Sequence, residues 1–246
     1  MVELLDPQPG QTVLEIAAGP GVTGFQLLPR IQPGGALIST DAAPEMVDVA
    51  RRRAAELALE GVSFAVEDAA NLSFEDDSVD ALLCRFGIML VPDTARTAAE
   101  MARVVRPGGR VVLAVWASSR LNPWMTATGR AALELGLTDP PDRDAPGPFR
   151  LADEEQLRSV VLGGGLEIQV AEDVPVSWAA GSLAEWWDVS RDTSRMLTQL
   201  LARLSDGQAA TLRRAAEAHL EEYVAADGSL TVPGVARVVQ AVAPAP

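Results

Sequence analysis

The first half of the chain alternates short apolar runs with longer segments whose apolar residues recur at helical spacing. The apolar runs have the length of buried strands, and the segments between them have the length of helices. This alternation predicts right-handed crossovers and an α/β fold with a doubly wound parallel sheet. The predicted strands cover residues 12–17, 35–40, 62–66, 79–86 and 110–117, and the predicted helices cover residues 21–31, 43–60 and 93–105.

The second half has a different pattern. Residues 139–149 form a loop rich in Pro and Asp, and helical spacing dominates residues 182–226, with a break near Asp206 and Gly207. We expect this half to add edge strands and a helical insertion to the same sheet. Its other predicted elements are helices at residues 122–136 and 153–165 and strands at residues 166–176 and 234–243.

Composition and charge narrow the possible partners. The formal net charge of −14 repels phosphate backbones, so we expect no nucleic-acid partner. The apolar runs are well short of the ~20 residues that a membrane-spanning helix needs. With no basic and apolar leader and one cysteine, Cys84, the pattern is typical of a cytoplasmic protein without a membrane partner. One cysteine and one histidine, His219, favour no metal site.

The first predicted strand runs into the stretch VLEIAAGPGVTG, residues 13–24. Gly19, Gly21 and Gly24 match the G-x-G-x-x-G pattern that is associated with dinucleotide binding. Glu15 stands just before this turn, where a carboxylate would repel the diphosphate of a nicotinamide cofactor. The same carboxylate would attract a ligand that carries an ammonium or a sulfonium group.

Two more acidic residues follow the next two strands. Asp41 is positioned to accept hydrogen bonds from a ribose diol, and Asp68 can accept one from the amino group of adenine. Because ligands bind at the carboxyl ends of parallel strands, these residues and Glu15 should line one site. A ligand with a cation, a diol and an aminopurine suits them, and S-adenosyl-L-methionine (S-adenosylmethionine) has all three.

Four segments carry a resemblance to a known family: VLEIAAGPG, STDAAPEMVDVARRRA, EDAANLSFEDDSVDALLCRF and EMARVVRPGGRVVLAVW. In this order they resemble class I S-adenosylmethionine-dependent methyltransferases, closest to the ubiquinone-biosynthesis-like small-molecule group, over roughly residues 9–117. The resemblance implies a Rossmann-like seven-stranded sheet whose last strand, residues 234–243, runs antiparallel. It also implies one methyltransferase domain over residues 1–246, with a cofactor-binding core at 1–117 and substrate-shaping helices and the last two strands at 118–246.

The resemblance assigns cofactor contacts residue by residue. The residues expected around the methionine moiety are Glu15, Ala17, Gly19 and Gly21, and those expected against the adenosine are Asp41, Ala42, Met46, Asp68 and Ala69. Arg85 and Phe86 would face the methionine end and the substrate. The family usually has glycine at position 17, and we expect the methyl group of Ala17 to cause only mild crowding. The residues expected to shape the acceptor pocket are Met89, Asn122, Trp124, Phe149 and Trp186.

The resemblance implies methyl transfer to a small molecule at an oxygen, carbon or nitrogen atom. The aromatic residues of the second half, such as Trp124, Phe149 and Trp186, suggest that this acceptor is apolar or aromatic. The sequence identifies no general base. Two alternatives stay open, a non-methylating relative that binds the cofactor structurally, as a cyclase or binding module, and a nicotinamide-dependent oxidoreductase. The oligomeric state is also open, with a homodimer as one option. Since the chain reaches its first strand within a few residues of Met1, we expect an exposed cofactor cleft.

Overall fold

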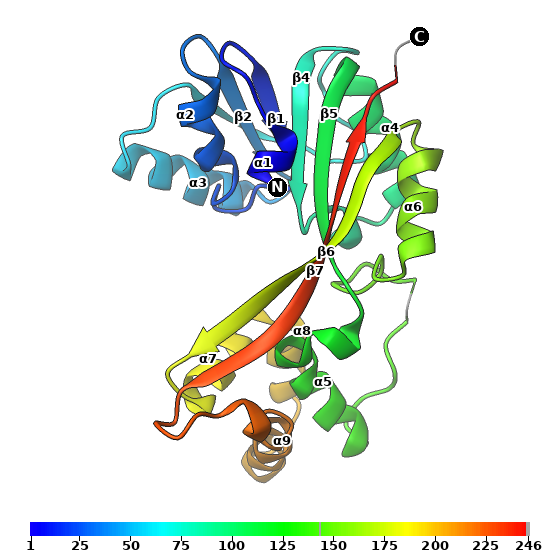
Figure 1. Cartoon of the computed structure of the whole chain (residues 1–246). Helices are drawn as coiled ribbons and strands as arrows, with labels where there is room; N and C mark the ends of the chain where they lie inside the picture. The colour runs from blue at the N-terminus through cyan, green and yellow to red at the C-terminus, as the bar shows by residue number, and fades with distance from the viewer. Residues whose placement is uncertain (143, 245–246) are drawn as a thin grey trace. The chain divides into compact units, whose positions relative to one another are not determined.

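The computed structural model describes residues 1–142 and 144–244. It has one seven-stranded sheet with the strand order β3-β2-β1-β4-β5-β7-β6 and an antiparallel β7, which confirms the predicted fold class. Figure 1 shows these strands with the helices that join them. The strands are β1 (Thr12–Glu15), β2 (Ala36–Asp41), β3 (Val62–Val66), β4 (Val79–Arg85), β5 (Val105–Trp116), β6 (Glu167–Ala180) and β7 (Leu230–Val242).

The helices are mostly short, and several are single 3-10 turns. In the first half they are α1 (Val2–Leu5), η1 (Gly24–Leu27), α2 (Leu28–Ile31), α3 (Pro44–Glu56), η2 (Ile88–Leu90) and α4 (Thr94–Val104). In the second half they are η3 (Ser119–Leu121), α5 (Pro123–Glu134), α6 (Glu154–Gly163), α7 (Leu183–Thr193), α8 (Arg195–Leu201), α9 (Asp206–Ala218) and η4 (Glu221–Tyr223).

The register of the central strands brings their carboxyl ends to one edge of the sheet. β1 pairs in parallel with both β2 and β4, so that Glu15 lies opposite Ser39 on one side and Leu83 on the other. β2 pairs in parallel with β3 up to Asp41, and β4 pairs in parallel with β5 up to Arg85. The loops that carry the predicted cofactor residues therefore leave the sheet along the same edge.

Three local features differ from the predicted elements. The helix expected over residues 21–31 is reduced to η1 and α2, because Gly21 has a left-handed backbone (φ 75°) and the helical turns begin only at Gly24. Strand β5 begins at Val105, before the predicted start at residue 110, through a register shift against β4 with Gly108 at φ 78°. The last helical region also breaks once more than predicted, between α7 and α8.

The chain divides into two compact units, which are described separately. Unit 1 comprises Met1–Trp116, Asp144–Asp173 and Arg237–Pro246, and unit 2 comprises Ala117–Arg143 and Val174–Ala236. The division into a core at 1–117 and a remainder within one domain stays a prediction.

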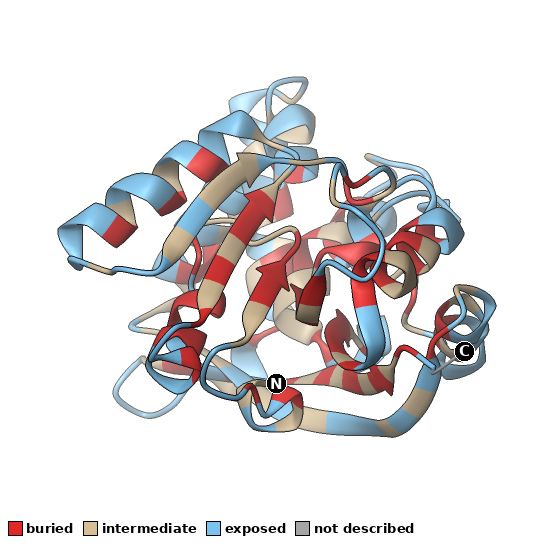
Figure 2. Cartoon of the chain, turned by 90° about the horizontal axis from the view of Figure 1, so that it is seen from above, coloured by how far each residue is buried: buried red, intermediate tan, exposed pale blue. Residues whose placement is uncertain are grey.

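Each unit has its own apolar interior. In unit 1 the buried residues follow the central strands, and α4 packs against both β5 and α6. In unit 2 the side chains of α5, α7, α8 and α9 surround the buried Trp186 and Leu212. Figure 2 shows the buried residues along the strands and the exposed residues on the outer faces of the helices. Among the described helices, none combines the length and the apolar character that crossing a membrane requires.

Candidate functional site

The loop that follows β1, residues 16–23, is here named the β1 loop. Ala17, Gly19 and Gly21 all have positive φ angles, 51°, 54° and 75°. A Cβ atom added to Gly19 would meet nothing within 4 Å, whereas one added to Gly21 would overlap the ring of Phe25. The loop is therefore packed against η1 at Gly21 and open at Gly19, where a ligand can approach the backbone.

Glu15 lies beneath the β1 loop with an exposure of only 1%. Its Oε1 atom accepts a hydrogen bond of 2.9 Å from the Gly24 amide, and its Oε2 atom has no hydrogen-bond partner among the described residues. A Cβ atom at Gly24 would overlap Oε2. Burial raises the pKa of Glu15 to about 7, against the opposing effects of the Gly24 amide and the Arg85 charge, while the Asp41 charge raises it further. A bound cation would favour the ionised form.

Asp41, the last residue of β2, joins two parts of the candidate site. Its Oδ2 atom accepts a hydrogen bond of 2.8 Å from the Gly19 amide, and its Oδ1 atom accepts one of 3.0 Å from Ala43. A carboxylate offers about four lone-pair sites, so about two stay available for hydroxyl donors. Ala42 is exposed, and Met46, on the first turn of α3, is 43% exposed. These two residues form an accessible apolar surface beside the carboxylate.

The segment between β3 and β4, residues 67–78, is here named the β3 segment, and it has no helix or strand. Asp68 is exposed, and its Oδ1 atom accepts a hydrogen bond of 2.9 Å from Ala70. Ala69 is 8% exposed and belongs to the apolar core of unit 1. The Asp68 carboxylate is therefore exposed, while the neighbouring Ala69 fixes the segment to the core.

Arg85 and Phe86 stand at the carboxyl end of β4. Phe86 has a φ of 60°, and its ring stacks on that of Trp116 with centroids 4.1 Å apart and planes 7° apart. The guanidinium carbon of Arg85 lies 5.5 Å from the centroid of the Phe86 ring. A left-handed backbone is rare for a bulky residue and costs roughly 1–3 kcal/mol. This strain lies at the same edge of the sheet as the β1 loop.

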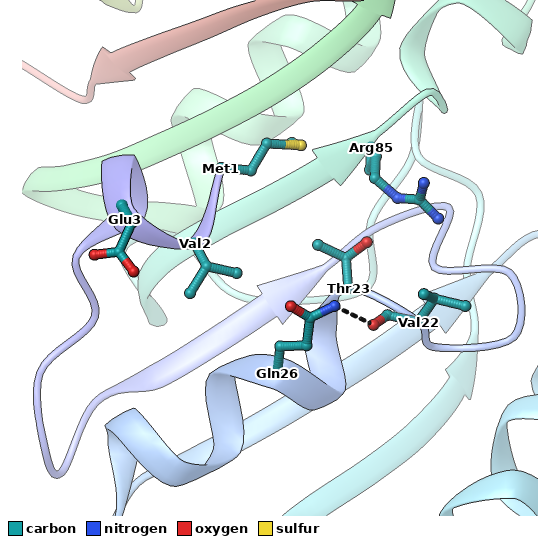
Figure 3. A pocket seen from close by; sticks show the side chains of 7 residues that line it. All are labelled: Met1, Val2, Glu3, Val22, Thr23, Gln26 and Arg85. Atoms are coloured by element: carbon teal, nitrogen blue, oxygen red, sulfur yellow. Dashed lines mark hydrogen bonds between the residues drawn. The ribbon is translucent and has the colours of Figure 1, made fainter. Parts of the chain in front are cut away.

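An open pocket of about 380 Å³ lies between the β1 loop and the end of β4. Figure 3 shows Thr23 and Arg85 entering it from these two elements, with Met1 beside them. Gln26 holds one wall by donating a hydrogen bond of 3.0 Å to the carbonyl of Val22. The full lining consists of Met1, Val2, Glu3, Val22, Thr23, Gln26 and Arg85.

Two of the predicted acceptor residues lie in unit 1. Met89 is 2% exposed and packs in the core of the unit, and Phe149 is half-buried. The Gly147 amide donates a hydrogen bond of 3.1 Å to the Met89 carbonyl, so the segment that carries Phe149 is attached to η2. Sequence separation had hidden this proximity.

The other three predicted acceptor residues belong to unit 2. Asn122 is fully buried, and its amide donates to the carbonyls of Ser118 and Val235 and accepts from the Val235 amide at 3.0 Å. Trp186 is fully buried and donates a hydrogen bond of 3.0 Å to the carbonyl of Trp124, whose ring stacks on Trp178. These contacts hold unit 2 together, and an acceptor role for the three residues stays a prediction.

Sequence reasoning missed the residues that support the site from behind. Phe25 packs under Gly21, and Glu100 and Arg103 of α4 bind the β3 segment. Their only sequence signals are an aromatic residue after the glycine pattern and an acid–base pair three residues apart on a helix. Among the described residues, no group of three or more His, Cys, Asp or Glu side chains could hold a metal ion.

Comparison with known protein families identifies the family. The profile of the ubiE/COQ5 methyltransferase family matches residues 1–128, which is just over half of the chain. The chain belongs to the ubiE/COQ5 methyltransferase family. This confirms the resemblance inferred from the motifs and implies S-adenosylmethionine as the cofactor.

Individual relatives match only the first part of the chain. It is 40% identical over 110 residues to the ubiquinone/menaquinone biosynthesis C-methyltransferase UbiE of Acidiphilium cryptum (strain JF-5), a match covering 44% of this chain and 43% of that protein. It is 35% identical over 113 residues to nocamycin O-methyltransferase of Saccharothrix syringae, covering 46% and 40%. The matched part therefore spans less than half the length of either relative.

The fold similarity extends over the whole chain. The crystal structure of the YcgJ protein of Bacillus subtilis aligns with a TM-score of 0.65 at 20% sequence identity, covering 100% of this chain and 97% of that one. At this identity the likeness supports the fold alone.

The residues of the candidate site fit the cofactor of the ubiE/COQ5 methyltransferase family. The open face of Gly19 admits a ligand against the backbone, and buried Glu15, whose Oε2 atom has no hydrogen-bond partner among the described residues, would be favoured in its ionised form by a bound cation. Asp41 keeps acceptor capacity for hydroxyl groups next to this face. The three features suit a cationic nucleoside.

Proposed function

We propose that this protein transfers the methyl group of S-adenosylmethionine to a small-molecule acceptor that is apolar or aromatic. The observation that carries the proposal is the hydrogen bond from the Gly19 amide to Asp41. It joins the ends of β1 and β2 in an arrangement that leaves carboxylate lone pairs beside an open backbone face.

In this proposal each acidic residue recognises a different part of the cofactor. Glu15 acts through its charge and by fixing the Gly24 amide, since it lies under the loop and does not face outward. Asp41 accepts hydrogen bonds from the ribose hydroxyls, with Ala42 and Met46 against the adenosine. Asp68 accepts a hydrogen bond from the adenine amino group, beside Ala69.

The remaining cofactor residues complete the methionine end. Gly19 provides the open backbone face, with Ala17 and Gly21 in the same loop, and Arg85 and Phe86 stand where the methionine moiety and the acceptor would meet. When bound, the cofactor supplies a methyl group on a positively charged sulfur. The chain contributes alignment of donor and acceptor, which can be worth about 7–11 kcal/mol of the barrier.

The ionisable groups at this edge favour acceptors that need little help from a base. Arg85 stays charged and cannot take a proton, and Glu15 is buried beneath the loop. Phenols, enols and amines lose a proton or share a lone pair more easily than alcohols, so we propose them as acceptors. The names of the two relatives above include both C- and O-methylation, and they leave the acceptor atom open.

Calorimetric titration with S-adenosylhomocysteine tests the proposal. Asp41→Ala should weaken binding by roughly 1.5–3 kcal/mol, which is about 10- to 150-fold in Kd. Asp48→Ala is the matched control, because Asp48 is an exposed aspartate on α3 that pairs with the neighbouring Arg51. A 3′-deoxy analogue separates the ribose contacts from effects on the loop. The wild type should bind this analogue less tightly than the parent compound, whereas Asp41→Ala should bind the two compounds equally tightly.

Turnover separates methyl transfer from the two alternatives. Incubation with S-adenosylmethionine and a panel of phenols, enols and amines should release S-adenosylhomocysteine with at least one acceptor. Tight binding without product for every class would favour the structural use of the cofactor. Binding of NADH in preference to S-adenosylhomocysteine would overturn the assignment.

A further inference from the structure

The β3 segment needs partners for its backbone because it forms neither helix nor strand. A buried peptide group without a hydrogen bond costs free energy comparable to that of a lost bond. Leu72 of this segment is 5% exposed, so its amide and carbonyl are both withdrawn from water. Glu67 and Asp68 bind amides within the segment, and the partners of Leu72 come from one face of α4.

Glu100 and Arg103 supply most of these contacts. The Oε2 atom of Glu100 accepts a hydrogen bond of 2.9 Å from the Leu72 amide. Arg103 donates to the carbonyl of Leu72 at 3.0 Å and to that of Phe74 at 2.7 Å. Glu100 is 3% exposed, and the half-buried Arg103 also binds it at 2.7 Å, so one ion pair contacts both the amide and the carbonyl of Leu72.

Arg96 extends the same row one turn earlier on α4. Its Nε atom donates a hydrogen bond of 3.3 Å to the carbonyl of Ala70, and its guanidinium lies 3.3 Å from Glu100. The amide of Ala70 in turn donates to Asp68. A continuous chain of contacts therefore runs from three side chains of α4 to the carboxylate that stands at the edge of the sheet.

We infer that Arg96, Glu100 and Arg103 are positioning residues that set the conformation in which the β3 segment presents Asp68 to the purine of the cofactor. The inference rests on the proposed function, in which Asp68 recognises the adenine amino group. These residues would set base selectivity without touching the cofactor. If the contacts with Leu72 and Phe74 are removed, Asp68 should no longer be held where it distinguishes one purine from another.

The test compares two ligands that differ only at the purine, S-adenosylhomocysteine and S-inosylhomocysteine, which has a carbonyl oxygen where adenine has its amino group. The wild type should prefer the adenine compound by about tenfold or more in Kd, because the carbonyl cannot donate to Asp68. Arg103→Met should reduce this ratio to within about threefold of unity. A purely structural role would weaken both ligands equally and leave the ratio unchanged.

Two further variants keep the test decisive. Asp76→Ala is the control, since Asp76 is 75% exposed and its loss leaves the Arg103 contacts to the backbone in place. Arg96→Met removes the contacts that this exposed side chain makes with Ala70 and Glu100, and it should lower the ratio about two- to threefold. An unchanged ratio in both arginine variants overturns the inference while the proposed function stands. A wild type that does not bind S-adenosylhomocysteine overturns the proposed function itself.

Discussion

The β1 loop and the β3 segment both lie at the carboxyl edge of the sheet, yet they are held by different means. The β1 loop is held partly by its own left-handed backbone angles and by Glu15, which lies nine residues before its partner Gly24, and partly by Asp41 of β2. The β3 segment is held in large part by side chains of α4 that follow it by about 30 residues, such as Arg103. A motif can encode the local part of the first arrangement, whereas the contacts of α4 depend on packing between distant elements.

The largest effect is expected from crowding Gly24, the first residue of η1 after the β1 loop. Gly24→Ala places a methyl group onto the buried Oε2 atom of Glu15 and should destabilise the fold by about 3 kcal/mol. Chemical denaturation measures the change. Gly163→Ala is the control, because a Cβ at that helical glycine meets nothing within 4 Å, and equal effects in both variants would contradict the proposed packing.

The buried Glu15 should make stability fall as pH rises. Its pKa is raised by burial to about 7 from an ordinary value of 4.5, so between these pH values the folded state holds a proton that the unfolded state has lost. Its contribution is fully present below pH 4.5 and is lost as pH rises through about 7, a change of about 2.5 kcal/mol between pH 5 and pH 8.

The measurement is the free energy of unfolding of the wild type and of Glu15→Gln across this pH range. The buried amide of glutamine has a free-energy cost of its own, but this cost does not depend on pH because the amide does not titrate. The difference between the two variants should therefore change with pH, and parallel curves would show that Glu15 does not titrate in this window.

Loss of the α4 contacts should come next in size. Arg103→Met leaves the buried Glu100 carboxylate without its main cation and frees two backbone carbonyls, which should destabilise the fold by about 2 kcal/mol. Asp76→Ala should change stability by less than about 0.5 kcal/mol, since exposed ion pairs contribute little. Urea denaturation of both variants measures the two changes in the free energy of unfolding. Similar losses of stability would mean that the exposed contact with Asp76 contributes as much as the contacts with Glu100 and the backbone.

The smallest effect concerns the position where the family usually has glycine. A Cβ atom at Gly87 would overlap that of Ala17, so Gly87→Ala should cost less in an Ala17→Gly background. We expect a coupling energy of about 1 kcal/mol from the double-mutant cycle. Additive effects would mean that the residues at positions 17 and 87 are not in steric contact. Cys84, at 3.0 Å from the added atom, would account for any cost that remains.

Apolar periodicity and turn chemistry were enough to predict the sheet, because both act over a few neighbouring residues. The same reasoning placed Glu15 and Asp41 at strand ends, and the resemblance supplied the number of strands and the antiparallel last strand, whereas the strand order came from the structure. The expectation for Ala17 is mild crowding by its methyl group. In the structure the unfavourable feature of Ala17 is its left-handed backbone angle, a φ of 51°. Alanine rarely adopts a positive φ, so the residue type alone would predict an ordinary negative angle at this position.

The sequence by itself determined the α/β fold, the edge that carries the acidic residues and the family to which the chain belongs. Only the tertiary structure decided that Glu15 lies beneath its loop, that Phe86 has a left-handed backbone and stacks on Trp116, and that α4 contacts the β3 segment. The physical reason is the sequence distance between the residues that interact. Periodicity and glycine turns are local, whereas burial and the pairing of Arg103 with Leu72, 31 residues earlier, exist only once distant segments have packed together.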